Sequence, residues 1–127
     1  MITSISEDSK YITSISNGNE TIYSDVTKEK GGNGQFFRPH DLIEAGYASC
    51  LNITTRMILD SMNIEYNKIV VAVDLDRRNE KKTIFKYKVD IIGIIDESIK
   101  NTVIKKLKNC PVTKTLSKEI EFQCENK

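Results

Sequence analysis

The stretch HDLIEAGYASCLNITTRMILDSMN, residues 40–63, decides the fold. Pro39 stands just before it, where the missing backbone N–H costs nothing, and Asn63 closes it. Apolar residues cover more of this stretch than the single stripe of an ordinary surface helix. We therefore predict one long helix, with Cys50 in its middle, surrounded either by the rest of one domain or by a second subunit of a dimer.

A helical wheel gives this helix two sides. At about 100° per residue, Cys50 lies opposite Asp41. The polar side holds Asp41, Glu44, Asn52, Thr55 and Arg56. The side of Cys50 holds Ile43, Gly46, Thr54 and Met57. We expect Cys50 to face the interior, and Gly46, one turn earlier, to leave room for another element or a ligand.

The other segments predict strands and a second helix. DESIKNTVIKKLKNC, residues 96–110, is amphipathic, and Asp96 suits its N-cap. Alternating apolar and polar residues predict strands at 1–6, 11–16, 20–26, 68–77, 82–94 and 119–126. This order of elements, in a chain of 127 residues, predicts a single α+β domain with a largely antiparallel sheet packed on the long helix.

Composition argues against several classes of function. A net charge of +1 gives no field that would concentrate nucleic acid. The chain has no apolar run of the roughly 20 residues that cross a bilayer, and its start lacks a signal-peptide pattern. We therefore expect a cytoplasmic protein, with no nucleic-acid or membrane partner. His40 is the only histidine and the cysteines are far apart, so no metal site is expected.

The cysteines are the residues that offer chemistry. In a reducing compartment they are expected to be free thiols, either packed as small apolar residues or redox-active. Cys110 precedes Pro111 in NCPVTKTL, residues 109–116, where a short helix would make Cys110 its cap. Its sulfur would then meet unpaired backbone N–H groups, which favour a thiolate. Cys124 falls in the last predicted strand and is expected to pack in or near the sheet.

Two motifs carry a resemblance. RPHDLIEAGYASCLNITTRMIL, residues 38–59, resembles the central helix of the OsmC/Ohr family, in which a proline-led helix carries LxxAxxxxC or a close variant. CPVTKTLSKEIEF, residues 110–122, is similar to that family's second motif, a Cys-Pro that opens a short helix before a final strand. The resemblance implies an intertwined homodimer that reduces organic hydroperoxides with two thiols and without a cofactor.

The resemblance also assigns roles. It makes Cys50 the attacking thiolate, which becomes a sulfenic acid, and Cys110 the thiol that resolves it to a disulfide. An external thiol reductant would then regenerate both. Peroxide-reducing members have a glutamate after the helix-opening proline and an arginine from an early strand, whereas this chain has His40 and no arginine in residues 1–37. Arg38 and His40 are therefore the candidates to stabilise the thiolate.

Alternatives stay open on the sequence. Local chemistry favours Cys110 as the more acidic thiol, whereas the resemblance gives first attack to Cys50. The same dimeric fold would also suit a non-catalytic protein that binds an apolar small molecule beside Gly46 and Cys50. A thiol-based redox sensor is the third possibility.

Overall fold

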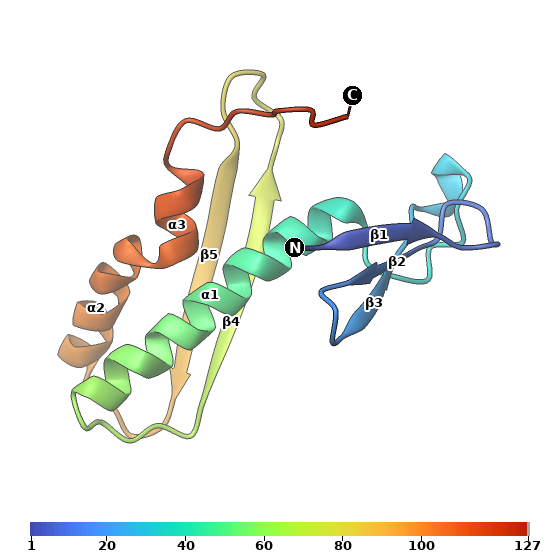
Figure 1. Ribbon diagram of the computed structural model, residues 1–127. Helices are drawn as coiled ribbons and strands as arrows, with labels where there is room; N and C mark the ends of the chain where they lie inside the picture. Colours follow the sequence, from blue (N-terminus) through green and yellow to red (C-terminus); the bar gives the residue numbers. More distant parts are fainter. Residues whose placement is uncertain (127) are drawn as a thin grey trace. The chain divides into compact units, whose positions relative to one another are not determined.

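The computed structural model describes residues 1–126 and divides into two compact units (Figure 1). One unit runs from Met1 to Ile43, and the other begins at Glu44. Each unit is described by itself below.

The first unit contains a small antiparallel sheet. Its strands are β1 (Thr3–Ser6), β2 (Thr13–Ser16) and β3 (Thr21–Ser24), and β2 lies between the other two. Asn17 closes the β2–β3 hairpin, because its side-chain oxygen accepts hydrogen bonds from the backbone N–H groups of Asn19 and Glu20. Gly18 adopts a φ of 99° in this turn, a conformation that few other residues tolerate.

A buried carboxylate organises the glycine-rich loop that follows. Asp25 is 1% exposed, and its two oxygens accept backbone hydrogen bonds from Val26 at 2.7 Å and Asn33 at 3.0 Å. The loop begins with the short helix η1 (Lys28–Lys30). A Cβ at Gly32 would overlap Asp25 and the carbonyl of Val26, so the chain passes too close there for a side chain.

The long helix α1 (Pro39–Ser61) confirms the main prediction. Pro39 is its first residue, and Asp41 lies in the first turn, where the positive end of the helix dipole favours a carboxylate. The chain leaves the helix through Asn63, whose φ of 55° is the left-handed conformation that Asn tolerates better than most residues.

The second unit contains a long antiparallel hairpin, β4 (Lys68–Asp76) and β5 (Ile84–Ile92). Successive side chains point to opposite faces of a sheet, so every second residue faces the same way. The register aligns Val71 with Val89 and Val73 with Tyr87 on the face that meets the hydrophobic core. The charged residues 77–82 lie in the loop that joins the two strands.

Three further helical segments follow the hairpin (Figure 1): α2 (Glu97–Lys106), η2 (Leu107–Asn109) and α3 (Pro111–Leu116). Asp96 caps α2 as predicted, since its side chain accepts a hydrogen bond from the backbone N–H of Ser98. Val103 and Leu107 are fully buried on the inner side of this segment. They pack against side chains from α1 and the hairpin.

The predicted last strand, residues 119–126, is not formed. Within residues 1–126 no strand pairs with this segment, and Ile120 and Phe122 are 55% and 93% exposed. Cys124 is exposed as well, so the expectation that it packs in the sheet is wrong. The alternating sequence is there, but an extended segment becomes a strand only when another strand supplies its hydrogen bonds. The α+β class with antiparallel sheets is confirmed.

Candidate functional site

The site is built around Cys50, which lies in the middle of α1. Its thiol is partly buried, and its polar neighbour is the hydroxyl of Thr54, one turn later, with 3.9 Å between sulfur and oxygen. The side chain packs against a core cluster formed by Tyr47, Leu51, Leu107 and Cys110. Cys50 therefore lies at the edge of the core rather than at its centre.

The buried face of α1 differs from the one that the wheel predicts. The buried residues follow each other at intervals of four: Tyr47, Leu51, Thr55 and Leu59. By contrast, Ile43 and Met57 are exposed, and a Cβ at Gly46 would meet nothing within 4 Å. Thr55 can be buried despite its hydroxyl because that hydroxyl donates a 2.7 Å hydrogen bond to the carbonyl of Leu51.

Cys110 is fully buried and is the N-cap residue of α3, as predicted. Its sulfur, however, makes no hydrogen bond to the backbone of that helix. It lies 2.9 Å from the hydroxyl oxygen of Thr113, which is the third residue of α3. The predicted contact between this sulfur and helix N–H groups is therefore wrong, because a side-chain hydroxyl takes the place of the backbone donor.

The two cysteines share one cluster, although 60 residues separate them in the chain (110 − 50 = 60). Tyr47 links the two helices that carry them. It belongs to α1, and its phenolic oxygen accepts a 3.2 Å hydrogen bond from Thr113 of α3. Its ring meets Phe85 and Tyr87 edge-on, with ring centroids 5.3 Å and 5.9 Å apart. One face of the thiol cluster is thus aromatic.

Burial raises the pKa of Tyr47 above its ordinary value. The hydrogen bond from Thr113 acts in the opposite direction, while Tyr87, Cys110 and Cys50 each add to the increase in this pKa. The phenol stays protonated at neutral pH and can donate its hydrogen.

Sequence reasoning missed Tyr47 and Thr113. Each stands three residues from a cysteine, Tyr47 before Cys50 and Thr113 after Cys110. In a helix this spacing places side chains on neighbouring turns of the same side. The three-residue spacing therefore indicates that Tyr47 and Thr113 lie near the two cysteines, and the helical wheel drawn for Cys50 does not include it.

The two predicted thiolate-stabilising residues lie at the start of α1. Arg38 pairs with Asp41: its guanidinium donates at 3.0 Å, and its backbone N–H donates at 2.9 Å. These hydrogen bonds hold the pKa of Asp41 below its usual range. His40 is exposed in the first turn.

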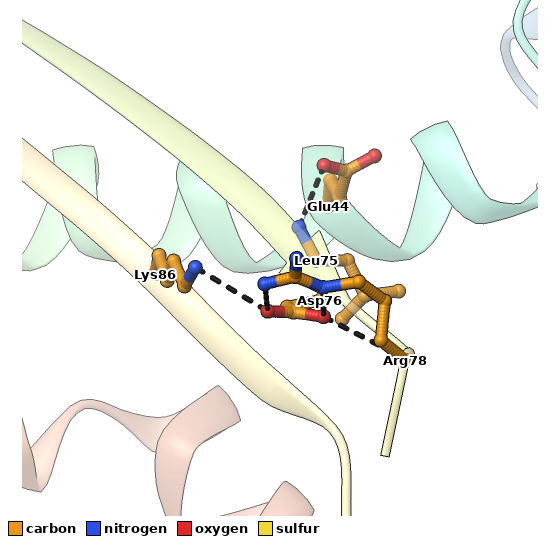
Figure 2. A network of polar contacts seen from close by, with 5 residues as sticks. All are labelled: Glu44, Leu75, Asp76, Arg78 and Lys86. Atoms are coloured by element: carbon orange, nitrogen blue, oxygen red, sulfur yellow. Dashed lines mark hydrogen bonds and ion pairs between the residues drawn. The ribbon is translucent and has the colours of Figure 1, made fainter. Parts of the chain in front are cut away.

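A separate polar network lies at the far end of the hairpin (Figure 2). Glu44 of α1 accepts a 3.1 Å hydrogen bond from the backbone N–H of Leu75. Beside it, Asp76 accepts from Arg78 at 2.7 Å and pairs with Lys86 at 3.3 Å, and the hydrogen bonds from Arg78 hold the pKa of Asp76 far below its usual range. Arg78 and Lys86 balance the charge of Asp76 within the hairpin, and the hydrogen bond from Leu75 to Glu44 ties α1 to β4.

Residues 1–126 contain neither a cluster of metal ligands nor a membrane-spanning helix. No group of three or more His, Cys, Asp or Glu side chains is placed to hold a metal ion. Across the same residues, none of the helices combines the length and apolarity that crossing a membrane requires.

Comparison with known proteins identifies the family. Among the solved structures that share the fold is an OsmC-like protein from Mycoplasma pneumoniae, with a TM-score of 0.77 and 20% identity over 91% of this chain and 85% of that one. An organic hydroperoxide resistance protein from Elizabethkingia anophelis has a TM-score of 0.65 and 20% identity over 94% of this chain and 89% of that one. The organic hydroperoxide resistance protein OhrB of Bacillus subtilis has a TM-score of 0.59 and 20% identity over 92% of this chain and 89% of that one. No curated protein matches the sequence. The family model for OsmC-like protein matches residues 32–125, and the chain therefore belongs to the OsmC-like protein family.

Proposed function

We propose that this protein is a thiol peroxidase that reduces organic hydroperoxides with Cys50 and Cys110. The observation that carries the proposal is the packing of both thiols in one cluster. Family membership and the hydroperoxide resistance proteins among its structural neighbours support a peroxide-related redox role.

The reaction has two thiol steps. The Cys50 thiolate attacks the outer oxygen of the hydroperoxide, the O–O bond breaks, and the alcohol leaves after taking up a proton. Cys50 then holds a sulfenic acid. Cys110 attacks that sulfur, a disulfide forms and water leaves, and an external dithiol reduces the disulfide to restore both thiols.

Burial supports this order of attack. Cys50 is partly exposed, whereas Cys110 is fully buried, so a peroxide reaches Cys50 more easily. The rings of Tyr47, Phe85 and Tyr87 favour a substrate with an apolar or aromatic group over a small hydrated one. Arg38 and His40 stay the proposed sources of positive charge for the Cys50 thiolate.

We further propose that the working protein is a homodimer. Ile53 and Met57 on α1 are 41% and 66% exposed, and Ile120 and Phe122 of the carboxyl-terminal segment are exposed as well. A second copy would cover these apolar side chains and provide a strand edge for residues 119–126. Sedimentation or light scattering of the purified protein tests this: a single-chain mass at micromolar concentration would contradict it.

The activity test is the consumption of cumene hydroperoxide with a dithiol reductant. Wild-type protein is expected to turn over, Cys50→Ser to lose all activity above the background rate, and Cys110→Ser to turn over more slowly, because the external dithiol must then reduce the Cys50 sulfenic acid directly. Cys124→Ser is the matched control, because Cys124 is exposed and outside the cluster, and it should behave as wild type. Equal rates for wild type and Cys50→Ser would refute the proposal.

The open space at Gly46 favours a second candidate, a non-catalytic protein that binds an apolar small molecule next to Cys50. Saturable binding of cumyl alcohol by a protein that does not consume cumene hydroperoxide would favour this candidate. A redox sensor would instead form the Cys50–Cys110 disulfide once and resist reduction by dithiols.

A further inference from the structure

A hydrogen-bonded chain leads from the resolving thiol to a buried phenol. The Cys110 sulfur lies 2.9 Å from the Thr113 hydroxyl oxygen, and that hydroxyl donates to the phenolic oxygen of Tyr47 at 3.2 Å. Because Thr113 has a single hydrogen and gives it to Tyr47, its oxygen accepts from the Cys110 thiol. These two hydrogen bonds therefore run in one direction, from the Cys110 S–H to Thr113 and from Thr113 to Tyr47.

The surroundings hold each member in place. Cys110 is the extended N-cap of α3, with φ −64° and ψ 146°, and Thr113 is three residues later on the same side. The Tyr47 ring is fixed by its edge contacts with Phe85 and Tyr87. Cys110 is fully buried and Tyr47 is only 6% exposed, so bulk water does not reach this thiol to accept its proton.

The phenol belongs to the core cluster against which the attacking thiol packs. Tyr47 precedes Cys50 by three residues, which places the two side chains on neighbouring turns of α1. The Tyr47 oxygen accepts its hydrogen bond from Thr113, so its own hydrogen is left to donate elsewhere.

We propose that Thr113 and Tyr47 form a proton relay from Cys110 to the oxygen that leaves Cys50 when the disulfide forms. The inference rests on the proposed peroxidase function. As the Cys110 sulfur bonds to the Cys50 sulfur and the S–O bond breaks, the Cys110 proton passes to Thr113. The Thr113 proton passes to Tyr47, and the Tyr47 proton passes to the leaving oxygen. Sulfenic acid and thiol become disulfide and water, so atoms and electrons balance.

The test separates the first thiol step from the second. All variants carry Cys124→Ser to remove the exposed thiol. Thr113→Val keeps the shape but removes the hydroxyl, Thr113→Ser keeps the hydroxyl, and Tyr47→Phe removes the phenolic oxygen. Thr115→Val is the matched control, because Thr115 lies in the same short helix and its hydroxyl donates only to the carbonyl of Pro111.

Stopped-flow mixing with one equivalent of cumene hydroperoxide follows the reaction, with dimedone trapping and mass spectrometry to count sulfenic acid at Cys50. We expect sulfenic acid to form at the wild-type rate in the Thr113 and Thr115 variants. Disulfide formation should slow by about 100-fold or more in Thr113→Val and Tyr47→Phe, in the range of a lost proton transfer. Thr113→Ser and Thr115→Val should stay near wild type, and the solvent deuterium isotope effect on this step should fall in Thr113→Val.

A second measurement does not need a hydroperoxide. Cys50 is converted to its mixed disulfide with 2-mercaptoethanol, and release of 2-mercaptoethanol by Cys110 is timed. In this exchange the Cys110 proton goes to the departing sulfur, so the same variants should be slow. If wild-type protein never forms sulfenic acid but Thr113→Val is slow in this exchange, the peroxidase function is refuted while the path of the Cys110 proton through Thr113 stays supported.

The relay is overturned if Thr113→Val releases 2-mercaptoethanol at the wild-type rate. It is also overturned if Thr113→Ser is as slow as Thr113→Val, because the loss would then come from packing rather than from the hydroxyl. Slowing of both thiol steps by the same factor would point to a displaced cluster and would equally refute it.

Discussion

Oxidation of Cys50 and Cys110 to a disulfide is expected to stabilise the protein strongly against unfolding. The two residues share one core cluster in the folded chain, so the bond should close without large movement. In the unfolded chain it would close a loop of 60 residues (110 − 50 = 60). The chain-entropy relation gives about 14 cal/mol/K for such a loop, or about 4 kcal/mol at 25 °C.

Urea unfolding of oxidised and reduced protein measures this effect. With a slope of about 2 kcal/mol/M, the midpoint of the oxidised form should lie about 2 M higher. Both forms carry Cys124→Ser and are compared at one protein concentration, because association would also shift the midpoint. Cys110→Ser, which cannot form the bond, should have the same midpoint under both conditions. A disulfide confirmed by mass with an unchanged or lower midpoint would refute the inferred proximity.

Three further predictions concern the scaffold. Leu59→Ala should lower the free energy of unfolding by about 2–5 kcal/mol, because Leu59 is fully buried, whereas Ile94→Ala at an exposed position should cost far less; urea unfolding compares them. Gly32→Ala should lower the thermal stability of the amino-terminal unit, because its Cβ would overlap the Val26 carbonyl; an unchanged melting curve would contradict this. Asp76→Asn should be less stable than wild type at neutral pH. The pKa of Asp76 is lowered far below its ordinary 3.8, so its contribution is fully present above that pH. The stability gap should begin to narrow below about pH 4 and close only as pH falls through the lowered pKa of the folded state.

The sequence was sufficient for the order and type of most elements. Periodicity located α1, both long strands and α2, since each pattern there reflects burial within a single chain. The Cys-Pro pair likewise placed the start of α3 at Pro111. These features depend on local spacing and capping, which a sequence displays directly.

The features that sequence reasoning did not predict depend on hydrogen-bond partners that only the folded chain provides. Thr55 was assigned to the polar side of α1, yet it is buried, because its hydroxyl bonds to the helix itself. Residues 119–126 alternate like a strand, but a strand also needs an adjacent edge. The Cys110 sulfur meets Thr113 rather than helix N–H groups, a choice between two nearby donors that only the folded geometry decides.

The anchoring of the glycine-rich loop by Asp25 has a consequence for how this segment can vary. Asp25 binds the backbone N–H groups of Val26 and Asn33 and uses no side chain of the loop. Side chains at positions such as Lys28 and Glu29 can therefore be exchanged without loss of the anchor, whereas an inserted or deleted residue would move the second donor away from the carboxylate. Apart from Gly32, which has no room for a side chain, the length of this loop is under stricter constraint than its composition.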